Sequence, residues 1–467
     1  MRKVRLLLVL ALIAGVAALT QAGATTAAGQ AELDPQLAAA MAGATGQLEV
    51  VVTFKGSGAP TAADVQALRS SGVTKGFTYR RLPIAGVLAT PAQVTALSAR
   101  PEVLSLWANR PLRYENHEAT ILTGVDAVRA DAALTAQNGG VPIDGQGAGI
   151  LVNDSGIDGS HADLDFGPHV VQNVEAATNL HAVSDLLPVT FVENVENTDA
   201  TGGHGTHVAG IAGGSGARSA GKYEGVAPGS PLVGYGSGAG LAILDVLGGF
   251  DYAIANKDRY GLRVITNSWG DTSDSCTPVN PEEPVTRATK NAYDAGLVVV
   301  FSAGNSGPAE CTISGNYKKA PWVISVAATN KQKGLASFSS RGRPNGGGTI
   351  TIDGETWTWE DRPTLAAPGV DIVSTRTVSP VGLTGTKDAN LIEPAYLPYY
   401  TALSGTSMAA PHLAGIAAMM LDLNPALAPL RVKEILQQTA SALPYQPHEV
   451  GNGFVDAHAA VTQSATG

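Results

Sequence analysis

The chain has 467 residues, 44% of them hydrophobic and 15% charged, which is enough for a sizeable core spread over roughly two to four domains. The formal net charge of −10 argues against nucleic-acid binding, because that function needs a basic surface to meet phosphates. The two cysteines, Cys276 and Cys311, belong to no Cys-x-x-Cys pair, which argues against a thiolate zinc site.

The N-terminus has the three parts of a secretory signal peptide. Arg2, Lys3 and Arg5 precede an apolar run at Leu6–Leu19, and small residues follow at Ala22–Ala24. The alternative is a membrane anchor, but the run is shorter than the ~20 residues that span a bilayer. We therefore predict that residues 1–24 are removed, that the protein is extracellular, and that it has no membrane attachment afterwards. Export also permits a disulfide between the two cysteines, which the sequence alone does not decide.

Residues 25–46 are rich in Ala, Thr and Gly and are predicted to be a linker. Residues 47–114 then alternate short strand and helix patterns. The predicted strands are Leu48–Phe54, Val73–Tyr79, Ile84–Ala89 and Val103–Trp107, and the predicted helices are Thr61–Ser70 and Pro91–Ala99. The order strand–helix–strand–strand–helix–strand predicts a small α+β domain of the ferredoxin-like type.

From about residue 120 the chain changes to short, nearly continuous apolar runs separated by helical segments. The predicted strands are Gly149–Val152, Leu232–Gly234, Arg263–Asn267, Leu297–Ala303 and Trp322–Ala327, with helices at Ala239–Arg259 and Pro284–Ala295. This alternation predicts an α/β fold, a mostly parallel sheet covered by helices on both faces. Chemistry in such sheets is expected at the carboxyl ends of the strands.

Three segments hold residues that could act together in nucleophilic catalysis. Asp154 follows the first of these strands, while His204 and Ser407 each lie at the start of a helix rich in small residues. A serine hydroxyl needs an imidazole to accept its proton, and the imidazole needs a carboxylate that holds its tautomer. Taken singly, each segment could be a turn or a helix cap. Together, in the order Asp, His, Ser, they indicate nucleophilic catalysis by a serine.

The same segments resemble the subtilase family of serine peptidases, which has this order of catalytic residues. The resemblance rests on motifs that occur in the family's order along most of the chain. They are Gly205–Gly210 after His204, Val226–Pro228, Thr266–Gly270, Ser302–Asn305, Phe338–Gly342, Ala367–Gly369, Gly405–Ala409 with Pro411, and Gly451–Ala457. The resemblance implies a subtilisin-like catalytic domain at residues 115–467.

The resemblance also implies roles for individual residues. Asp154, His204 and Ser407 would form the catalytic triad, and Asn305 would donate its side-chain amide to the oxyanion. Extended peptide or protein substrates would pair with two edge segments and lie against a first pocket. The substrate-binding residues are expected to be Gly236, Ser237, Gly238, Ser268, Trp269, Gly270, Ala303 and Gly304. The pocket walls are small and mostly uncharged, so broad specificity with an apolar or neutral side chain before the cut is expected.

The small N-terminal domain resembles the family's propeptide, which assists folding and inhibits the enzyme until it is cut away. The segment Pro111–Glu115 could lie in the cleft like a substrate, and self-cleavage is predicted near Tyr114–His117. The mature enzyme is expected to be a monomer with its own propeptide as its inhibitor. The alternative is that residues 47–110 remain as a permanent structural domain.

The sequence departs from the family at the loop where many subtilases hold calcium. Residues 213–221 offer almost no side-chain oxygen ligands, so no cofactor is certain, although calcium elsewhere remains open. Asp163 matches a family calcium ligand but is predicted to be a surface carboxylate here. Residues 345–361 are predicted to form an added hairpin. No His-Glu-x-x-His motif occurs, and structural roles are expected for the histidines that flank the motifs, namely His161, His207 and His412.

Two other functions compete with an active peptidase. A catalytically silent relative would only bind peptides, but all four chemical positions are intact. An esterase of the α/β-hydrolase type would need Gly-x-Ser-x-Gly and the order Ser, acid, His. Here Ala409 replaces the second glycine, and the acid and base precede the serine.

Overall fold

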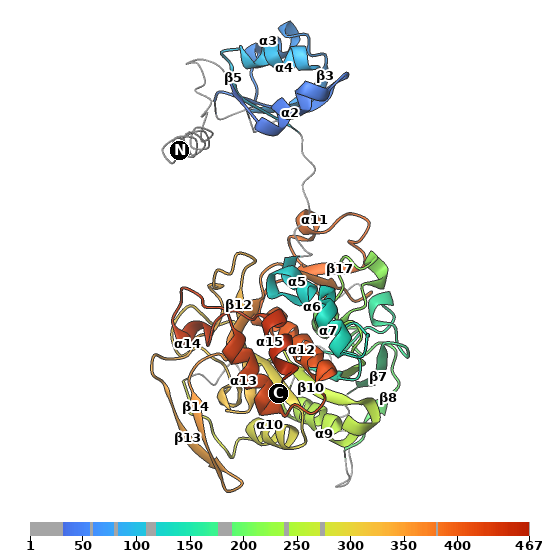
Figure 1. The fold of residues 1–467 in the computed structure, drawn as a ribbon, viewed down its shortest axis with the longest axis vertical. Coiled ribbons are helices and arrows are strands. Elements are labelled where there is room, and N and C mark those ends of the chain that lie inside the picture. Colours follow the sequence, from blue (N-terminus) through green and yellow to red (C-terminus); the bar gives the residue numbers. More distant parts are fainter. Residues whose placement is uncertain are drawn as a thin grey trace, which may run out of the picture. The chain divides into compact units, whose positions relative to one another are not determined.

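The computed structural model describes residues 31–56, 59–78, 83–108, 118–175, 189–237, 242–270, 276–379 and 382–466. The chain forms two compact units, Met1–Arg113 and Tyr114–Gly467 (Figure 1). The division falls one residue before the predicted boundary after residue 114. The predicted signal peptide and the predicted cleavage segment Tyr114–His117 lie outside the described residues.

The described part of the first unit is a five-stranded sheet in the order β1-β5-β2-β4-β3 with its helices. Its elements are β1 Glu32–Leu33, α2 Pro35–Gly43, β2 Leu48–Phe54, α3 Ala62–Ser70, β3 Lys75–Thr78, β4 Ile84–Ala89, α4 Pro91–Ser98 and β5 Val103–Ala108. Strands β2 to β5 with α3 and α4 have the predicted ferredoxin-like order. Thr61 and Thr90 begin the two helices with capping boxes, which satisfy the first backbone N–H groups.

The linker prediction for residues 25–46 is wrong where the structure describes it. β1 pairs in parallel with β5, and α2 packs on the same unit with Leu37 fully buried. Asp34, itself buried, accepts a hydrogen bond from the backbone N–H of Ala108 through Oδ2 at 3.2 Å. The composition suggested a flexible segment, but alanine is also the best helix former, and Pro35 stands at the first helical position, where its fixed φ suits a helix.

The described residues of the second unit contain an eight-stranded sheet in the order β15-β12-β11-β10-β6-β9-β7-β8. Its strands are β6 Gly149–Asp154, β7 Val170–Glu175, β8 Val192–Glu193, β9 Leu232–Gly236, β10 Leu262–Asn267, β11 Val298–Ser302, β12 Val323–Thr329 and β15 Leu365–Pro368. All neighbours are parallel except β7 and β8. This confirms the predicted mostly parallel sheet.

Helices cover both faces of this sheet. Successive residues of a strand point to opposite faces and therefore pack against different helices. Val298 and Val300 of β11 belong to one hydrophobic cluster, whereas Val299 and Phe301 belong to another. The first cluster includes residues of α8 His204–Gly213, α12 Thr406–Leu423, α13 Pro429–Thr439 and α15 Ala457–Ser464, and the second includes residues of α9 Ile243–Tyr260 and α10 Pro284–Asp294. Burial on both faces explains why the strand sequences are continuously apolar.

The remaining elements lie around these layers (Figure 1). They are α5 Glu118–Thr123, α6 Val125–Ala130, α7 Ala132–Gln137, η1 Ala162–Leu164, η3 Ala217–Ser219, η4 Asn316–Lys319, β13 Gly347–Ile352, β14 Glu355–Glu360, β16 Ile372–Thr375, α11 Asp388–Leu391, β17 Tyr400–Leu403 and α14 Pro447–Val450. β13 and β14 form the predicted hairpin around an Asp353–Gly354 turn, in which both residues have positive φ, as a tight hairpin turn requires. Cys276 and Cys311 form a disulfide between the segments that follow β10 and β11.

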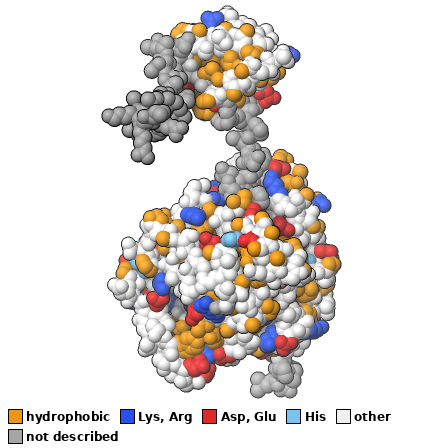
Figure 2. Space-filling model, viewed as in Figure 1, with side chains coloured by type: hydrophobic (Ala, Val, Ile, Leu, Met, Phe, Trp, Pro, Cys, Tyr) orange, Lys and Arg blue, Asp and Glu red, His pale blue; other side chains and the backbone are white. Residues whose placement is uncertain are grey.

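On the face of the second unit drawn in Figure 2, the Lys and Arg side chains of the described residues are scattered among acidic and neutral ones. This distribution fits the negative net charge. Among the described helices, none combines the length and the hydropathy needed to cross a bilayer.

Candidate active site

Three neighbouring parallel strands end at the same edge of the sheet, next to the starts of two helices. β6 ends at Asp154, β10 is followed by Ser268, and β11 leads to Asn305. Helices α8 and α12 pack against each other and both contact β6. The sheet therefore brings the predicted acid, the base-bearing helix and the serine-bearing helix to one place, as expected for parallel sheets.

Asp154 and His204 form a short, buried hydrogen bond. Nδ1 of His204 lies 2.6 Å from Oδ1 of Asp154, and the carboxylate is 3% exposed. The same oxygen accepts a hydrogen bond from the backbone N–H of Ser155 at 2.8 Å. A carboxylate accepts only, so Nδ1 carries the proton and Nε2 is left with a lone pair. The imidazole is thus held in the tautomer that a general base needs.

The pKa of His204 is raised above its ordinary value. Burial by itself would lower the pKa, but the charge of Asp154 and its hydrogen bond raise it by more, and the charge of Asp199 adds to this effect. The His204 side chain keeps 27% of its surface exposed, so one edge of the ring can still reach a substrate.

Gly205 allows α8 to lie this close to the end of β6. A Cβ at this position would collide with the backbone of Gly156 and would come within 3.1 Å of the Asp154 Cβ. A larger residue would push the helix, and with it His204, away from the carboxylate.

Ser407 lies in the first turn of α12 and is linked to Ser268 by two hydrogen bonds. Its Oγ donates to the Ser268 carbonyl at 3.0 Å, and Ser268 Oγ donates to the Ser407 carbonyl at 2.9 Å. The Ser407 carbonyl is available because Pro411, four residues later, has no N–H for the usual helix bond. Among the described hydrogen bonds, none joins Ser407 to His204; such links often form only when substrate binds.

The side chain of Asn305 is oriented by Thr406. Its Oδ1 accepts hydrogen bonds from the backbone N–H and from Oγ1 of Thr406, both at 2.9 Å, and Thr406 Oγ1 accepts from the N–H of Gly304 at 3.1 Å. With the oxygen held this way, the amide Nδ2 points away from Thr406 and lies beside Gly405. Nδ2 is therefore a donor placed next to the start of α12, where the N–H of Ser407 also lies.

Comparison with known proteins agrees with this geometry. The subtilase family matches residues 145–453, which is more than half of the chain. The chain belongs to the subtilase family. Serine protease AprX of Bacillus subtilis is 32% identical over 79% of this chain and 78% of its own length, and subtilisin DY of Bacillus licheniformis is 32% identical over 48% of this chain and 64% of its own. The solved structure of the S41 psychrophilic protease covers 71% of this chain at 27% identity with a TM-score of 0.51.

In this subtilase, the predicted substrate-binding residues that the structure describes lie at or just after the ends of β9, β10 and β11. Gly236 ends β9, and the N–H of Ser237 donates to the Asp154 carbonyl at 3.0 Å, while Gly238 lies outside the described residues. Trp269 is anchored by a bond from Nε1 to the Asn153 carbonyl at 2.9 Å. Ala303 is fully buried, and the N–H of Gly304 donates to Oγ1 of Thr406, the residue before Ser407.

The predicted walls of the first pocket, expected to be small and mostly uncharged, have a charged neighbour at Gly270. A Cβ added to Gly270 would collide with Nζ of Lys318, and it would lie 2.8 Å from Oγ of Ser314. The wall behind Gly270 therefore contains a buried ammonium group and a hydroxyl. The sequence does not indicate this, because Lys318 belongs to η4, a short helix far from the motif in sequence.

Asp163 is not the surface carboxylate that the sequence suggests, and it does not fit a calcium site. It is fully buried, and protein donors occupy both oxygens: the N–H of Arg218 at 2.7 Å and the hydroxyl of Tyr400 at 2.6 Å. Burial and the hydrogen bond to Asp163 raise the pKa of Tyr400, which keeps the phenol protonated as a donor. Among the described residues, no cluster of His, Cys, Asp or Glu could hold a metal ion.

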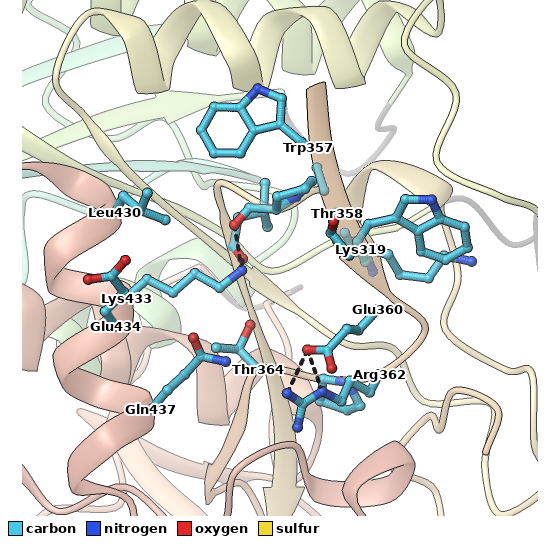
Figure 3. Close-up of a pocket in the computed structure, with 16 residues that line it drawn as sticks. Lys319, Trp357, Thr358, Glu360, Arg362, Thr364, Leu430, Lys433, Glu434 and Gln437 are labelled. Atoms are coloured by element: carbon cyan, nitrogen blue, oxygen red, sulfur yellow. Dashed lines mark hydrogen bonds and ion pairs between the residues drawn. The ribbon is translucent and has the colours of Figure 1, made fainter. Parts of the chain in front are cut away.

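A cavity of about 310 Å³ lies between the β13–β14 hairpin and α13, and none of the predicted site residues lines it (Figure 3). Trp357 lies on the hairpin side (Figure 3), and Trp359, which also lines the cavity, belongs to the same strand, β14. On the helix side, Lys433 donates to the carbonyls of Pro321 and Val323, each at 2.7 Å, and burial lowers its pKa to about 8. The cavity adjoins the start of β12, away from the catalytic edge of the sheet.

Sequence reasoning did not assign three residues that support the site. Thr406 orients Asn305, while Ser155 and Asp199 accept backbone N–H groups at the start of α8. One feature of the sequence could have indicated the roles of Ser155 and Asp199. α8 begins after a glycine, which has no side chain for a cap, so another residue must supply the acceptors.

Because the pKa of His204 is raised, kcat/KM should fall as the pH falls through a value above the usual ~6.5 of histidine. Asp154→Asn should lower kcat by about 10⁴-fold, as the same change does in a Ser-His-Asp peptidase, and should move this acid limb to lower pH. Steady-state kinetics between pH 5 and 9 on a peptide substrate measures both. An unchanged acid limb in the variant would mean that Asp154 does not set the His204 pKa.

Asn305→Ala should lower kcat by about 10²- to 10³-fold with little change in KM, as removal of this kind of donor does in subtilisin. Thr406→Val keeps the Asn305 amide but removes one of the two bonds that orient it, so a smaller loss in kcat is expected. Equal activity of the parent and Asn305→Ala would exclude the amide from transition-state binding.

Tyr400→Phe should lower the free energy of unfolding by about 1–3 kcal/mol, because it leaves one oxygen of a buried carboxylate without its donor. The neighbouring Tyr399→Phe should change it by less than about 0.5 kcal/mol. Urea unfolding in a Ser407→Ala background, which prevents autolysis, compares the two. Equal losses would show that the Asp163 bond is not what distinguishes Tyr400.

Proposed function

We propose that this serine endopeptidase is secreted and that Ser407, His204 and Asp154 carry out its chemistry. The observation that carries the proposal is the 2.6 Å hydrogen bond between Asp154 Oδ1 and His204 Nδ1, beside the helix that presents Ser407. Membership of the subtilase family supports the reaction class. The signal-peptide pattern at residues 1–24 supports secretion.

In the first half of the reaction, Ser407 Oγ bonds to the peptide carbonyl carbon while its proton moves to His204 Nε2. The carbonyl oxygen becomes an oxyanion, which Asn305 Nδ2 and the N–H of Ser407 stabilise. The C–N bond then breaks, and the leaving amine takes the proton from His204. An acyl group remains on Ser407. Water repeats the sequence: it gives a proton to His204 and attacks the acyl carbon. The bond between the acyl carbon and Ser407 Oγ then breaks, Oγ takes the proton back from His204, and the acid is released.

Substrate is proposed to bind as an extended strand along the segments that begin at Gly236 and Ser268. Backbone hydrogen bonds in strand addition are independent of side-chain identity, which supports broad specificity. The Ser268 carbonyl at present accepts the Ser407 hydroxyl, so it is a backbone acceptor directly beside the nucleophile. The protein is expected to act as a monomer.

The enzyme is further proposed to be made as a zymogen in which residues 47–114 form an inhibitory propeptide. Support comes from the first unit, which has a hydrophobic cluster of its own that includes Leu37, Val52, Phe54 and Leu106. A unit with its own core can fold and be released without opening the core of the second unit.

The test compares the parent, Ser407→Ala and the control Ser404→Ala, which changes an exposed serine just before α12. The parent and the control should react with a fluorophosphonate probe, hydrolyse casein and lose the segment before Tyr114–His117. Ser407→Ala should do none of these and should stay at the length left by signal-peptide removal. A parent that fails to react with the probe would support the silent, peptide-binding alternative. Processing of purified Ser407→Ala would exclude self-cleavage.

A further inference from the structure

The helix that carries His204 begins without a cap of its own. Its N-cap is Gly203, in the left-handed region at φ 82°, which has no side chain to accept the first N–H groups. A buried carboxylate takes this role: Asp199 Oδ1 accepts from the N–H of Gly203 at 2.8 Å, and Oδ2 accepts from the N–H of Thr206 at 2.9 Å and from its hydroxyl at 2.6 Å. Ser155 Oγ accepts from the N–H of Gly205 at 2.8 Å. The backbone on both sides of His204 is therefore held from outside the helix.

Asp199 is itself held in place. It is fully buried, and its own N–H donates to Asn197 Oδ1 at 2.8 Å. Thr206 links this turn to two other segments. Its hydroxyl accepts from the N–H of Asp158 at 3.0 Å, and its carbonyl accepts from Thr375 Oγ1 at 2.7 Å. These hydrogen bonds hold the Asp199 carboxylate in place, and they hold the first turn of α8 in place relative to it.

The charge of Asp199 matters as well as its hydrogen bonds. The positive end of a helix dipole disfavours a cationic histidine, and His204 lies at that end of α8. A negative charge at the same end offsets this effect, and the charge of Asp199 raises the pKa of His204. Burial raises the pKa of Asp199 itself, and hydrogen bonds from Thr206, Gly203 and Ser155 oppose that rise. Asp154 acts in the same direction from β6, and Asp158 is buried in the loop after it. His207 on α8 adds little charge, because burial lowers its pKa to about 3.

We propose that Asp199 is a positioning residue for catalysis. Its carboxylate fixes the first turn of α8, and its charge supports the imidazolium that forms on His204 when Ser407 gives up its proton. No described hydrogen bond joins Asp199 to the imidazole, so it acts through the helix and through the electric field. This inference rests on the proposed role of His204 as the general base.

The test is Asp199→Asn with Ser155→Ala as the matched control. Each variant removes an acceptor at the start of α8, and Ser155→Ala also removes a hydrogen bond to Asp199, but only Asp199→Asn removes the carboxylate itself. Asp199→Asn should lower kcat and move the acid limb of kcat/KM to lower pH, because the imidazolium loses a nearby anion. Ser155→Ala should lower kcat and move the limb by less than Asp199→Asn does, because the carboxylate stays in place. Coincident limbs in Asp199→Asn and the parent would overturn the proposal.

A second readout does not depend on proteolysis. The His204 titration is followed by NMR in the full chain with Ser407→Ala, with and without Asp199→Asn, and the His204 pKa should again fall. If the parent does not react with a fluorophosphonate, the proposed function is refuted. The NMR titration of His204 still tests the effect of Asp199 in that case. Asp199→Ser, which keeps one acceptor oxygen and no charge, should show the same shift. Failure of both variants to fold would make Asp199 a determinant of stability and overturn the proposal.

Discussion

The hydrogen bond between Asp154 and His204 is the interaction on which the rest of the site depends. It sets the imidazole tautomer and raises the pKa of His204 against the opposing effect of burial. It forms only because α8 lies against the end of β6, a contact that leaves no room for a side chain at Gly205. A local hydrogen bond thus depends on how closely a helix packs on a strand.

The proposed nucleophile and the proposed oxyanion donor depend on a second set of contacts, which join strand ends to the start of α12. Ser268 after β10 exchanges two hydrogen bonds with Ser407, and Asn305 after β11 is oriented by Thr406. Pro411 contributes by what it lacks, since its missing N–H leaves the Ser407 carbonyl for Ser268. The ends of the sheet strands therefore position the proposed reacting groups directly. Such fixed positions are the condition for electrostatic preorganisation.

Much of this architecture could be predicted, because motifs at strand ends and helix starts follow general rules. The parallel sheet, the βαββαβ order of the first unit and the β13–β14 hairpin all follow from period, caps and turn residues. The errors had a common cause. Composition made residues 31–46 look like a linker, and the missing loop ligands made Asp163 look exposed. In both cases partners far away in sequence, β5 and Tyr400, determined the outcome.

The sequence by itself determined the family, the order Asp154, His204, Ser407 and the helices that present the last two, because these are local patterns tied to backbone conformation. The tertiary structure alone decided which groups surround them: the Asp199 carboxylate at the start of α8, the Lys318 ammonium behind Gly270 and the Tyr400 hydroxyl on Asp163. Charges and hydrogen-bond donors act over a few ångströms in space. The separation of two residues along the chain does not determine their distance in space, so these neighbours follow only from the tertiary structure.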